Sequence, residues 1–158
     1  MATDRRNPAK GGPKTTARPS SRVPAFRYGI EQYSHLYLAL EAADIGIWDW
    51  DLRSNRIMMS ANMKRILDIG EDESGYTFDK FLKVIHPDDR PRIAAALKKT
   101  IRRKGSFDEE FRIEKKDRTL HWMRIRGRAP VGAGGVPDRV MGSLHDKTDR
   151  KMAFDALA

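Results

Sequence analysis

The side chains in this sequence that could bind a metal or exchange protons are mainly histidines and aspartates. The run His86-Pro87-Asp88-Asp89 places an imidazole beside two carboxylates, a combination able to bind a metal or to exchange protons. The following Pro91 is suited to the first turn of a helix, where its missing N–H costs nothing. A carboxylate at that position is favoured by the helix dipole. We therefore interpret His86 to Asp89 as a structural turn in which Asp88 or Asp89 caps a helix.

Two other groups of polar residues could form a site. His121 and His145, with Asp146 nearby, would lie close to a cross-strand diagonal if the last two strands form a hairpin, and could bind zinc or titrate. No third ligand has a clear spacing, so we favour polar residues at strand edges and expect no metal site. Asp49 and Asp51 share a strand face without a matching acid or base. No catalytic residue is therefore assigned, and the absence of cysteine removes thiolate ligands and nucleophiles.

The charge of the chain is concentrated at one end. Of 31 basic and 22 acidic residues in 158, seven basic and one acidic lie in residues 1–30, where large apolar residues are nearly absent. We expect residues 1–30 to form a disordered basic tail, because such a segment cannot bury enough apolar surface to order itself. The tail could bind nucleic acid, anionic lipid or an acidic partner, but we favour a solvated leader. No run is long and apolar enough for a membrane span, and we expect a cytoplasmic protein.

Periodicity predicts the elements of the rest of the chain. Apolar residues at helical spacing over 33–43 predict a flanking helix, and the alternation in Gly46–Asp51 and Arg56–Met59 predicts a hairpin. Ser60 and Thr77 are expected to cap two short helices, and a longer helix follows Asp89. Strands are predicted near 106–116, 119–130 and 137–146, followed by the start of a helix. The fold class is α+β: a five-stranded antiparallel sheet with helices packed across one face and an N-terminal flanking helix.

Five short sequences, in this order, resemble a PAS domain that carries a trailing PAC motif, of the PAS fold-3 type. They are Gly46–Asp51, His86–Arg90, Glu110–Arg112, the strand tryptophan Trp122, and the exit pair Asp146 and Thr148. The resemblance runs from about Ala39 to Lys151. It implies a sensory domain over 31–151, with 152–158 as the start of a C-terminal signalling helix. Two positions depart from the family pattern: Arg118 replaces a turn glycine, and Lys147 replaces an apolar residue within the exit.

The resemblance also implies a ligand pocket and limits the cofactors. We name Trp48, Trp50, Met59, Met63 and Met123 as pocket candidates, although each could equally be core. Family members that form a cysteinyl–flavin adduct need a cysteine, and the haem-binding ones use a histidine on the long helix. This chain has neither. A non-covalent flavin, an organic acid, an aliphatic ligand or an empty pocket all remain open.

The function implied is sensing or protein interaction in bacterial-style signal transduction, relayed through the terminal helices to a homodimer or a signalling partner. One alternative is the sensor segment of a histidine kinase or cyclic-di-GMP enzyme, so we expect no catalysis by this chain. A second alternative, nucleic-acid binding through the tail, lacks interleaved aromatic residues and is not favoured. Trp48 and Trp122 are expected to be buried anchors of the sheet. The alternating residues Glu110 and Arg112 on one strand and Arg124 and Arg126 on its neighbour suggest cross-strand ion pairs on a polar outer face.

Overall fold

The computed structural model describes residues 30–72 and 74–158, and side chains from Ser34 onward. The predicted basic tail therefore lies outside the described residues, apart from Ile30. The helices are α1 (Ile30–Ala42), α2 (Ala61–Ile66), α3 (Phe78–Val84), α4 (Arg90–Arg103) and α5 (Thr148–Ala156). The strands are β1 (Gly46–Asp51), β2 (Arg56–Met59), β3 (Tyr76–Thr77), β4 (Ser106–Glu114), β5 (Leu120–Arg128) and β6 (Arg139–Asp146).

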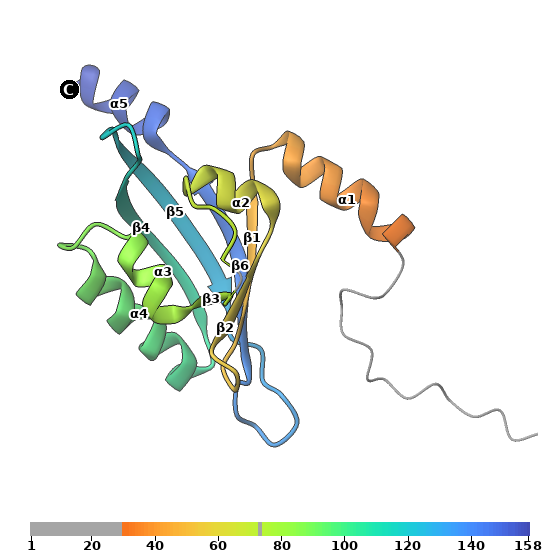
Figure 1. The fold of residues 1–158 in the computed structure, drawn as a ribbon. Helices are drawn as coiled ribbons and strands as arrows, with labels where there is room; N and C mark the ends of the chain where they lie inside the picture. Colours follow the sequence, from red (N-terminus) through yellow and green to blue (C-terminus); the bar gives the residue numbers. More distant parts are fainter. Residues whose placement is uncertain (1–29, 73) are drawn as a thin grey trace, which may run out of the picture.

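All the strands join one antiparallel sheet in the order β3-β2-β1-β6-β5-β4. The first strand, β1, pairs with the last, β6, so the two ends of the domain meet in the middle of the sheet (Figure 1). The predicted α+β fold is confirmed. The sheet has one strand more than expected, because the two-residue β3 pairs with Arg56 and Ile57 where the sequence pattern indicated only a loop and a helix cap.

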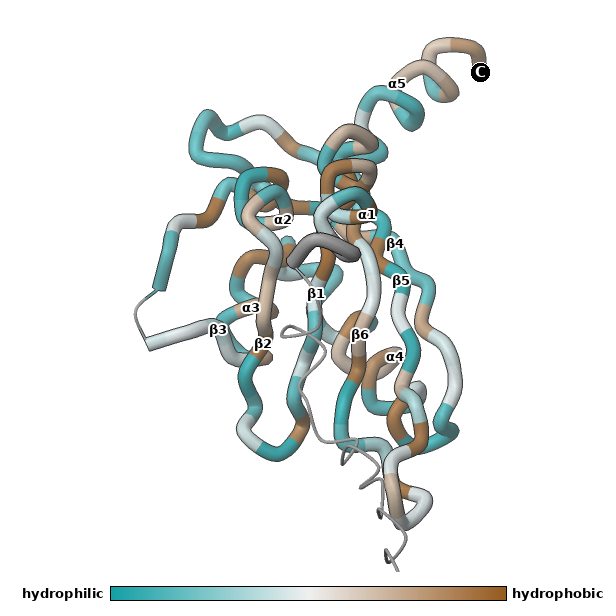
Figure 2. Tube along the Cα trace, turned by 90° about the vertical axis from the view of Figure 1, so that its right-hand side faces the viewer, coloured by the Kyte–Doolittle hydropathy of each residue, from teal (hydrophilic) through white to brown (hydrophobic). Residues whose placement is uncertain are grey.

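The helices α2, α3 and α4 cover one face of the sheet and enclose the core (Figure 1). Alternate strand residues point into it, as the period of two requires: Phe107, Phe111 and Ile113 from β4, and Met123 and Ile125 from β5, are all buried. Figure 2 views the sheet from the side away from α3 and α4, where hydrophilic and hydrophobic positions alternate along the strands. We call the helix-covered face the inner face and the opposite one the outer face.

Two glycines allow the central strands to approach closely. Gly127 of β5 lies opposite Gly142 of β6. A Cβ on Gly142 would lie 1.7 Å from the carbonyl oxygen of Arg126, and one on Gly127 would lie 2.6 Å from the indole ring of Trp48. The pair therefore leaves room on the inner face for the Trp48 ring to lie across the sheet.

The terminal helices do not cover the sheet. In Figure 1, α1 leaves the upper end of β1 and projects away, and α5 extends from the end of β6. Leu36 and Leu38 of α1 are 57% and 60% exposed, and Met152 and Phe154 of α5 are 66% and 74% exposed. The two helices therefore present apolar side chains that find no cover within the described chain. None of the helices formed by the described residues is long and apolar enough to cross a membrane.

Candidate functional site

A small cavity lies between the inner face of the sheet and the helices. It is lined by apolar side chains of β1, β2, β5 and α2–α4: Trp48, Trp50, Ile57, Met63, Phe78, Phe81, Leu97 and Ile125. Three of the five pocket candidates, Trp48, Trp50 and Met63, are among these residues. Met59 packs against the core and Met123 is buried within it, but neither lines the cavity.

Both tryptophans of β1 are fixed at the cavity wall by their polar ends. Trp48 is 4% exposed, and its indole N–H donates to the Ser143 carbonyl oxygen at 3.1 Å. The Trp50 indole N–H donates to the Asn55 side-chain oxygen at 3.0 Å, and its ring stacks on Phe78 at a centroid distance of 4.7 Å. A buried indole needs such a partner for its N–H, so these bonds hold the two rings in place.

The free space among these side chains is small. The cavity holds ≈ 10 Å³, at the lower limit of what one water molecule needs. Ligand pockets usually measure hundreds of Å³. The structure therefore represents a closed state of the cavity, and a flavin-sized or organic-acid ligand would require the lining side chains to move.

The exit from β6 to α5 is hydrogen-bonded to the backbone of Trp122 in β5. The Lys147 N–H donates to the Trp122 carbonyl oxygen at 2.7 Å, and the Trp122 N–H donates to the Thr148 hydroxyl at 3.0 Å. Asp146 accepts hydrogen bonds from the Thr148 N–H and hydroxyl. Burial raises the pKa of the Asp146 carboxyl, but the hydrogen bonds from Thr148 and the contact with His121 together outweigh it, so the pKa is lowered. We call Asp146, Lys147, Thr148 and Trp122 the exit junction.

The ring of Trp122 is not in the core. It is half-buried on the outer face, with the Lys151 ammonium 3.8 Å and the Arg112 guanidinium carbon 5.5 Å from the ring centroid. Lys151 also pairs with Glu110, and this bond lowers the pKa of the Glu110 carboxyl. The prediction of a buried anchor is wrong for Trp122, because this residue shares its strand face with Arg124 and Arg126. Trp48 is buried as predicted.

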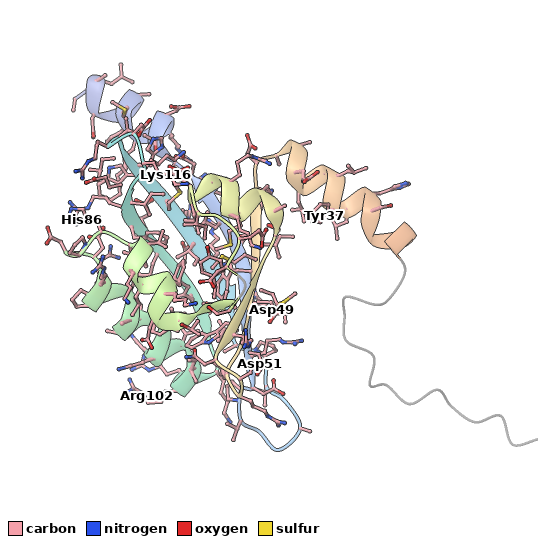
Figure 3. The ribbon with its side chains drawn as sticks, in the orientation of Figure 1. Tyr37, Asp49, Asp51, His86, Arg102 and Lys116 are labelled. Atoms are coloured by element: carbon pink, nitrogen blue, oxygen red, sulfur yellow. The ribbon has the colours of Figure 1, made fainter. Side chains whose placement is uncertain are left out.

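The turn His86–Asp89 is hydrogen-bonded to β4, and the Asp89 side chain does not cap α4. Asp89 is at the N-cap position of α4 without a side-chain cap bond, and its carboxylate accepts from the Arg112 N–H and guanidinium at 2.8–3.0 Å. These bonds hold the pKa of Asp89, which is 7% exposed, at about 2. His86 lies beside the start of α4 (Figure 3), and its N–H donates to the Arg112 carbonyl oxygen. Arg112 therefore connects this turn to Trp122.

His121 and His145 are separated by the sheet. His145 is opposite Arg124 on the outer face, whereas the His121 ring bonds the Asp146 carboxylate at 3.0 Å and the Thr119 hydroxyl at 2.9 Å. Among residues 30–72 and 74–158 no three histidine or acidic side chains are placed to hold a metal ion together. His121 instead links the β4–β5 turn to the exit junction, a role that its spacing from Asp146 did not reveal.

The expected cross-strand ion pairs form with different partners. Arg124 binds both oxygens of Asp108, diagonally across the β4–β5 pair, and Arg112 pairs with Asp89. Of the two acidic residues on β1, Asp49 lies 3.0 Å from the Arg139 guanidinium. Burial raises the pKa of the Asp49 carboxyl, although Arg139 opposes this shift.

Comparison with known proteins agrees with this arrangement. A family model described as PAS fold matches residues 56–144, more than half of the chain. Sensor protein FixL of Bradyrhizobium diazoefficiens is 30% identical over 78% of this chain, and a blue-light-activated histidine kinase of Brucella anthropi is 27% identical over 75%. The probable diguanylate cyclase DgcE of Escherichia coli is 28% identical over 76%.

A solved structure agrees as well. A sensory box histidine kinase/response regulator from Burkholderia thailandensis superposes with a TM-score of 0.62 at 34% identity, covering 78% of this chain and 92% of that chain. This chain spans only 24%, 11% and 23% of the FixL, DgcE and Brucella anthropi relatives, so the likeness concerns one domain of each. With the sheet, the helix-covered cavity and the family match together, the chain belongs to the PAS fold family.

Proposed function

We propose that this PAS domain is a sensory module in which the state of the core cavity is passed to α5 through β5. The observation that carries the proposal is the double use of this strand. Its inner face lines the cavity through Ile125, and its backbone holds the exit junction at Trp122, three residues earlier in the same strand. A change in the cavity that shifts β5 would therefore act directly on the bonds that start α5.

The chemistry of the cavity favours an apolar or aromatic ligand bound without a covalent bond. Its lining side chains are aromatic or aliphatic, and the indole N–H groups of Trp48 and Trp50 are already engaged. An organic acid would find no free donor among these residues, whereas a flat apolar ring could enter between Trp50 and Phe78. Native mass spectrometry of the purified protein would report a retained ligand directly.

Amide hydrogen exchange at the exit junction tests the relay. Ile125→Val removes one methyl group at the cavity wall and should cost about 0.5–1.5 kcal/mol of stability. Exchange of the Lys147 and Trp122 amides, both donors in the junction, should accelerate beyond this global effect. The matched control is Ile93→Val, a fully buried α4 residue that does not line the cavity. Equal acceleration in both variants would mean that only global stability is involved and would contradict the relay.

The apolar faces of α1 and α5 support self-association or docking to a signalling partner. Leu36, Leu38, Met152 and Phe154 are exposed in the single chain. We expect a weak homodimer, tightened by Lys147→Ile, because this change extends the apolar surface at the start of α5. Sedimentation over a concentration series measures both effects, and unchanged self-association in the variant would exclude the exit as the coupling element.

We infer that the chain itself has no catalytic activity and works in the cytoplasm. Among its relatives are a histidine kinase and a probable diguanylate cyclase, and the sensor segment of such a protein remains the alternative to a single-domain adaptor. Neither comparison assigns a reaction to the matched domain. Labelled ATP and GTP incubated with the purified chain should yield no phosphoprotein and no cyclic dinucleotide, and either product would refute this inference.

A further inference from the structure

The last two turns of α4 form a strongly basic surface at one end of the domain. Arg102 points away from the fold at the lower end in Figure 3, whereas Lys116 lies at the other end. The side chains that make up this surface are all exposed: Lys98, Lys99, Arg102, Arg103 and Lys104. We call them the α4 basic cluster.

Residues of the cluster are not neutralised within the described chain. Over residues 30–72 and 74–158 none of the five forms an ion pair, although Arg92, Arg112 and Arg124 all do. The helix dipole favours Arg102 and Arg103 in the last turn, but its effect fades before Lys98 and Lys99. Lys98 and Lys99 stand four residues before Arg102 and Arg103, so like charges repel along the helix. Such an arrangement is stabilised by an anion from outside.

Acidic groups near the cluster already have other partners. An open groove of ≈ 370 Å³ runs between α4 and β4, with Lys99 and Arg103 on its helix side and Asp108 and Glu109 on its strand side. Glu109 bonds Arg92 at 2.7 Å, and Asp108 binds Arg124. The positive charge of Lys99 and Arg103 is therefore left uncompensated beside this groove.

An apolar loop lies next to the cluster. The β5–β6 connection is tied to the end of α4 by the bond from the Ala129 N–H to the Gly105 carbonyl oxygen. Its valines Val131 and Val136 are 53% and 69% exposed. The Lys104 ammonium lies 3.8 Å from where a Cβ of Gly135 would stand. In Figure 1 the C-terminal end of α4 and the β5–β6 connection lie at the same, lower end of the molecule, so this end carries both basic and apolar side chains.

We propose that this end of the domain docks on the surface of an anionic lipid bilayer. The α4 basic cluster would lie against the lipid phosphates while Val131 and Val136 enter the headgroup region, the combination that peripheral membrane proteins use. Nucleic acid fits less well, because among the described residues no exposed aromatic ring accompanies the cluster to stack on bases. The inference goes beyond the proposed sensory function: it places the domain at a membrane without spanning it.

Vesicle co-sedimentation of the full chain tests the proposal. The vesicles contain phosphatidylcholine with about one third phosphatidylglycerol, and pure phosphatidylcholine vesicles serve as the neutral reference. Wild type should bind the anionic vesicles alone. Each basic residue near an anionic surface contributes about a fivefold gain in partitioning. The test variant should therefore lose on the order of 100-fold or more: Lys98→Gln, Lys99→Gln, Arg102→Gln and Arg103→Gln combined.

A control of equal charge separates the cluster from net charge and from the basic N-terminal segment. It removes four exposed or half-buried basic residues that lie outside the α4 end and form no ion pair among the described residues: Lys83→Gln, Lys115→Gln, Lys116→Gln and Arg150→Gln. The control should keep most of the binding. Equal losses in both variants, undiminished binding of the test variant, equal binding to neutral vesicles, or no binding at all would each overturn the proposal.

A second variant keeps every charge. Val131→Ser with Val136→Ser should weaken binding to anionic vesicles, and circular dichroism should show unchanged folding because both side chains are exposed. Duplex DNA is added as competitor in the same assay. If DNA displaced the protein from vesicles and its own binding depended on the α4 basic cluster but not on the two valines, the surface would be a nucleic-acid site and the membrane assignment would be wrong.

Discussion

Trp48 of β1 and Trp122 of β5 belong to one sheet, with β6 between their strands, and have different surroundings. Trp48 lies on the inner face, 4% exposed, across the gap that Gly127 leaves. Trp122 lies half-buried on the outer face, between the cations of Arg112 and Lys151. Strand alternation decides the difference, since Trp48 alternates with aspartates and Trp122 shares its face with arginines. The inner face of the sheet holds the fold together, and the outer face carries the contact between the Trp122 ring and Lys151 of α5.

The largest effect should come from truncating the inner tryptophan. Trp48→Ala should cost about 3–5 kcal/mol, because it leaves a cavity in the closed core. Trp122→Ala should cost about 1 kcal/mol, the scale of an exposed cation–π contact, since its backbone bonds to Lys147 and Thr148 remain. Urea unfolding of both variants measures the difference. Similar losses for the two would show that Trp122 belongs to the core after all.

The Asp89–Arg112 pair should give the next largest effect and a pH dependence. The pKa of Asp89 in the folded state is about 2, below the value near 3.9 of an unfolded chain. The pair therefore stabilises the fold fully above about pH 4, and this contribution is lost as the pH falls towards about 2. Asp89→Asn should lower stability by about 2 kcal/mol near neutral pH and by much less below about pH 3.

Urea unfolding of Asp89→Asn and wild type at several pH values checks this prediction. The matched control is Asp88→Asn, because Asp88 is exposed and its carboxylate is 3.8 Å from the His86 ring without an arginine partner. The control should unfold like wild type at every pH. A difference between Asp89→Asn and wild type that does not shrink in acid would mean that the charge of Asp89 is not what stabilises the turn.

A smaller effect is expected where α5 docks on the outer face. Lys151→Ala removes both the contact with the Trp122 ring and the pair with Glu110, together worth about 1 kcal/mol at an exposed site. Amide exchange in α5 should accelerate while β1 and the core strands keep their protection. Arg150→Ala is the control, being exposed and without an ion pair among the described residues. Equal effects of the two would remove Lys151 from the junction.

The smallest effect concerns the turn that leads into the Trp122 strand. Arg118 has a φ of +70°, a conformation that favours glycine. Its pair with Glu114 is exposed and contributes little. Arg118→Gly should therefore leave stability unchanged or raise it by up to about 1 kcal/mol. Arg118→Ala keeps the strain and loses the pair, so it should be less stable than Arg118→Gly. The reverse order in thermal unfolding would contradict the assignment of strain to this turn.

The strained position of Arg118 was predicted from the family resemblance, because glycine is usual there. Period-two and helical patterns were sufficient to predict the sheet apart from β3, and the burial of Trp48. They could not predict which ions pair. Arg124 reaches Asp108 and not Glu110, because long side chains choose between several partners across a strand pair. Nor could they show that the Asp89 carboxylate binds Arg112 and does not cap its own helix, because that contact joins residues 23 positions apart in the sequence. The arginine-rich face of β5 was the signal that should have placed Trp122 outside the core.

The smallness of the cavity has a consequence for measured affinities. Some ligands can enter only if the stacked Trp50 and Phe78 rings separate. Such a ligand either binds the fraction of protein molecules whose cavity is already open, or its binding free energy must offset the cost of opening the cavity. Its apparent dissociation constant is then the intrinsic one divided by the open fraction, so a site open one time in 100 binds about 100-fold more weakly than its contacts would suggest. Substitutions that weaken the Trp50–Phe78 stack would raise the apparent affinity without adding a contact to the ligand. Weak binding in a ligand screen would reflect the low population of the open form as much as the fit of the ligand.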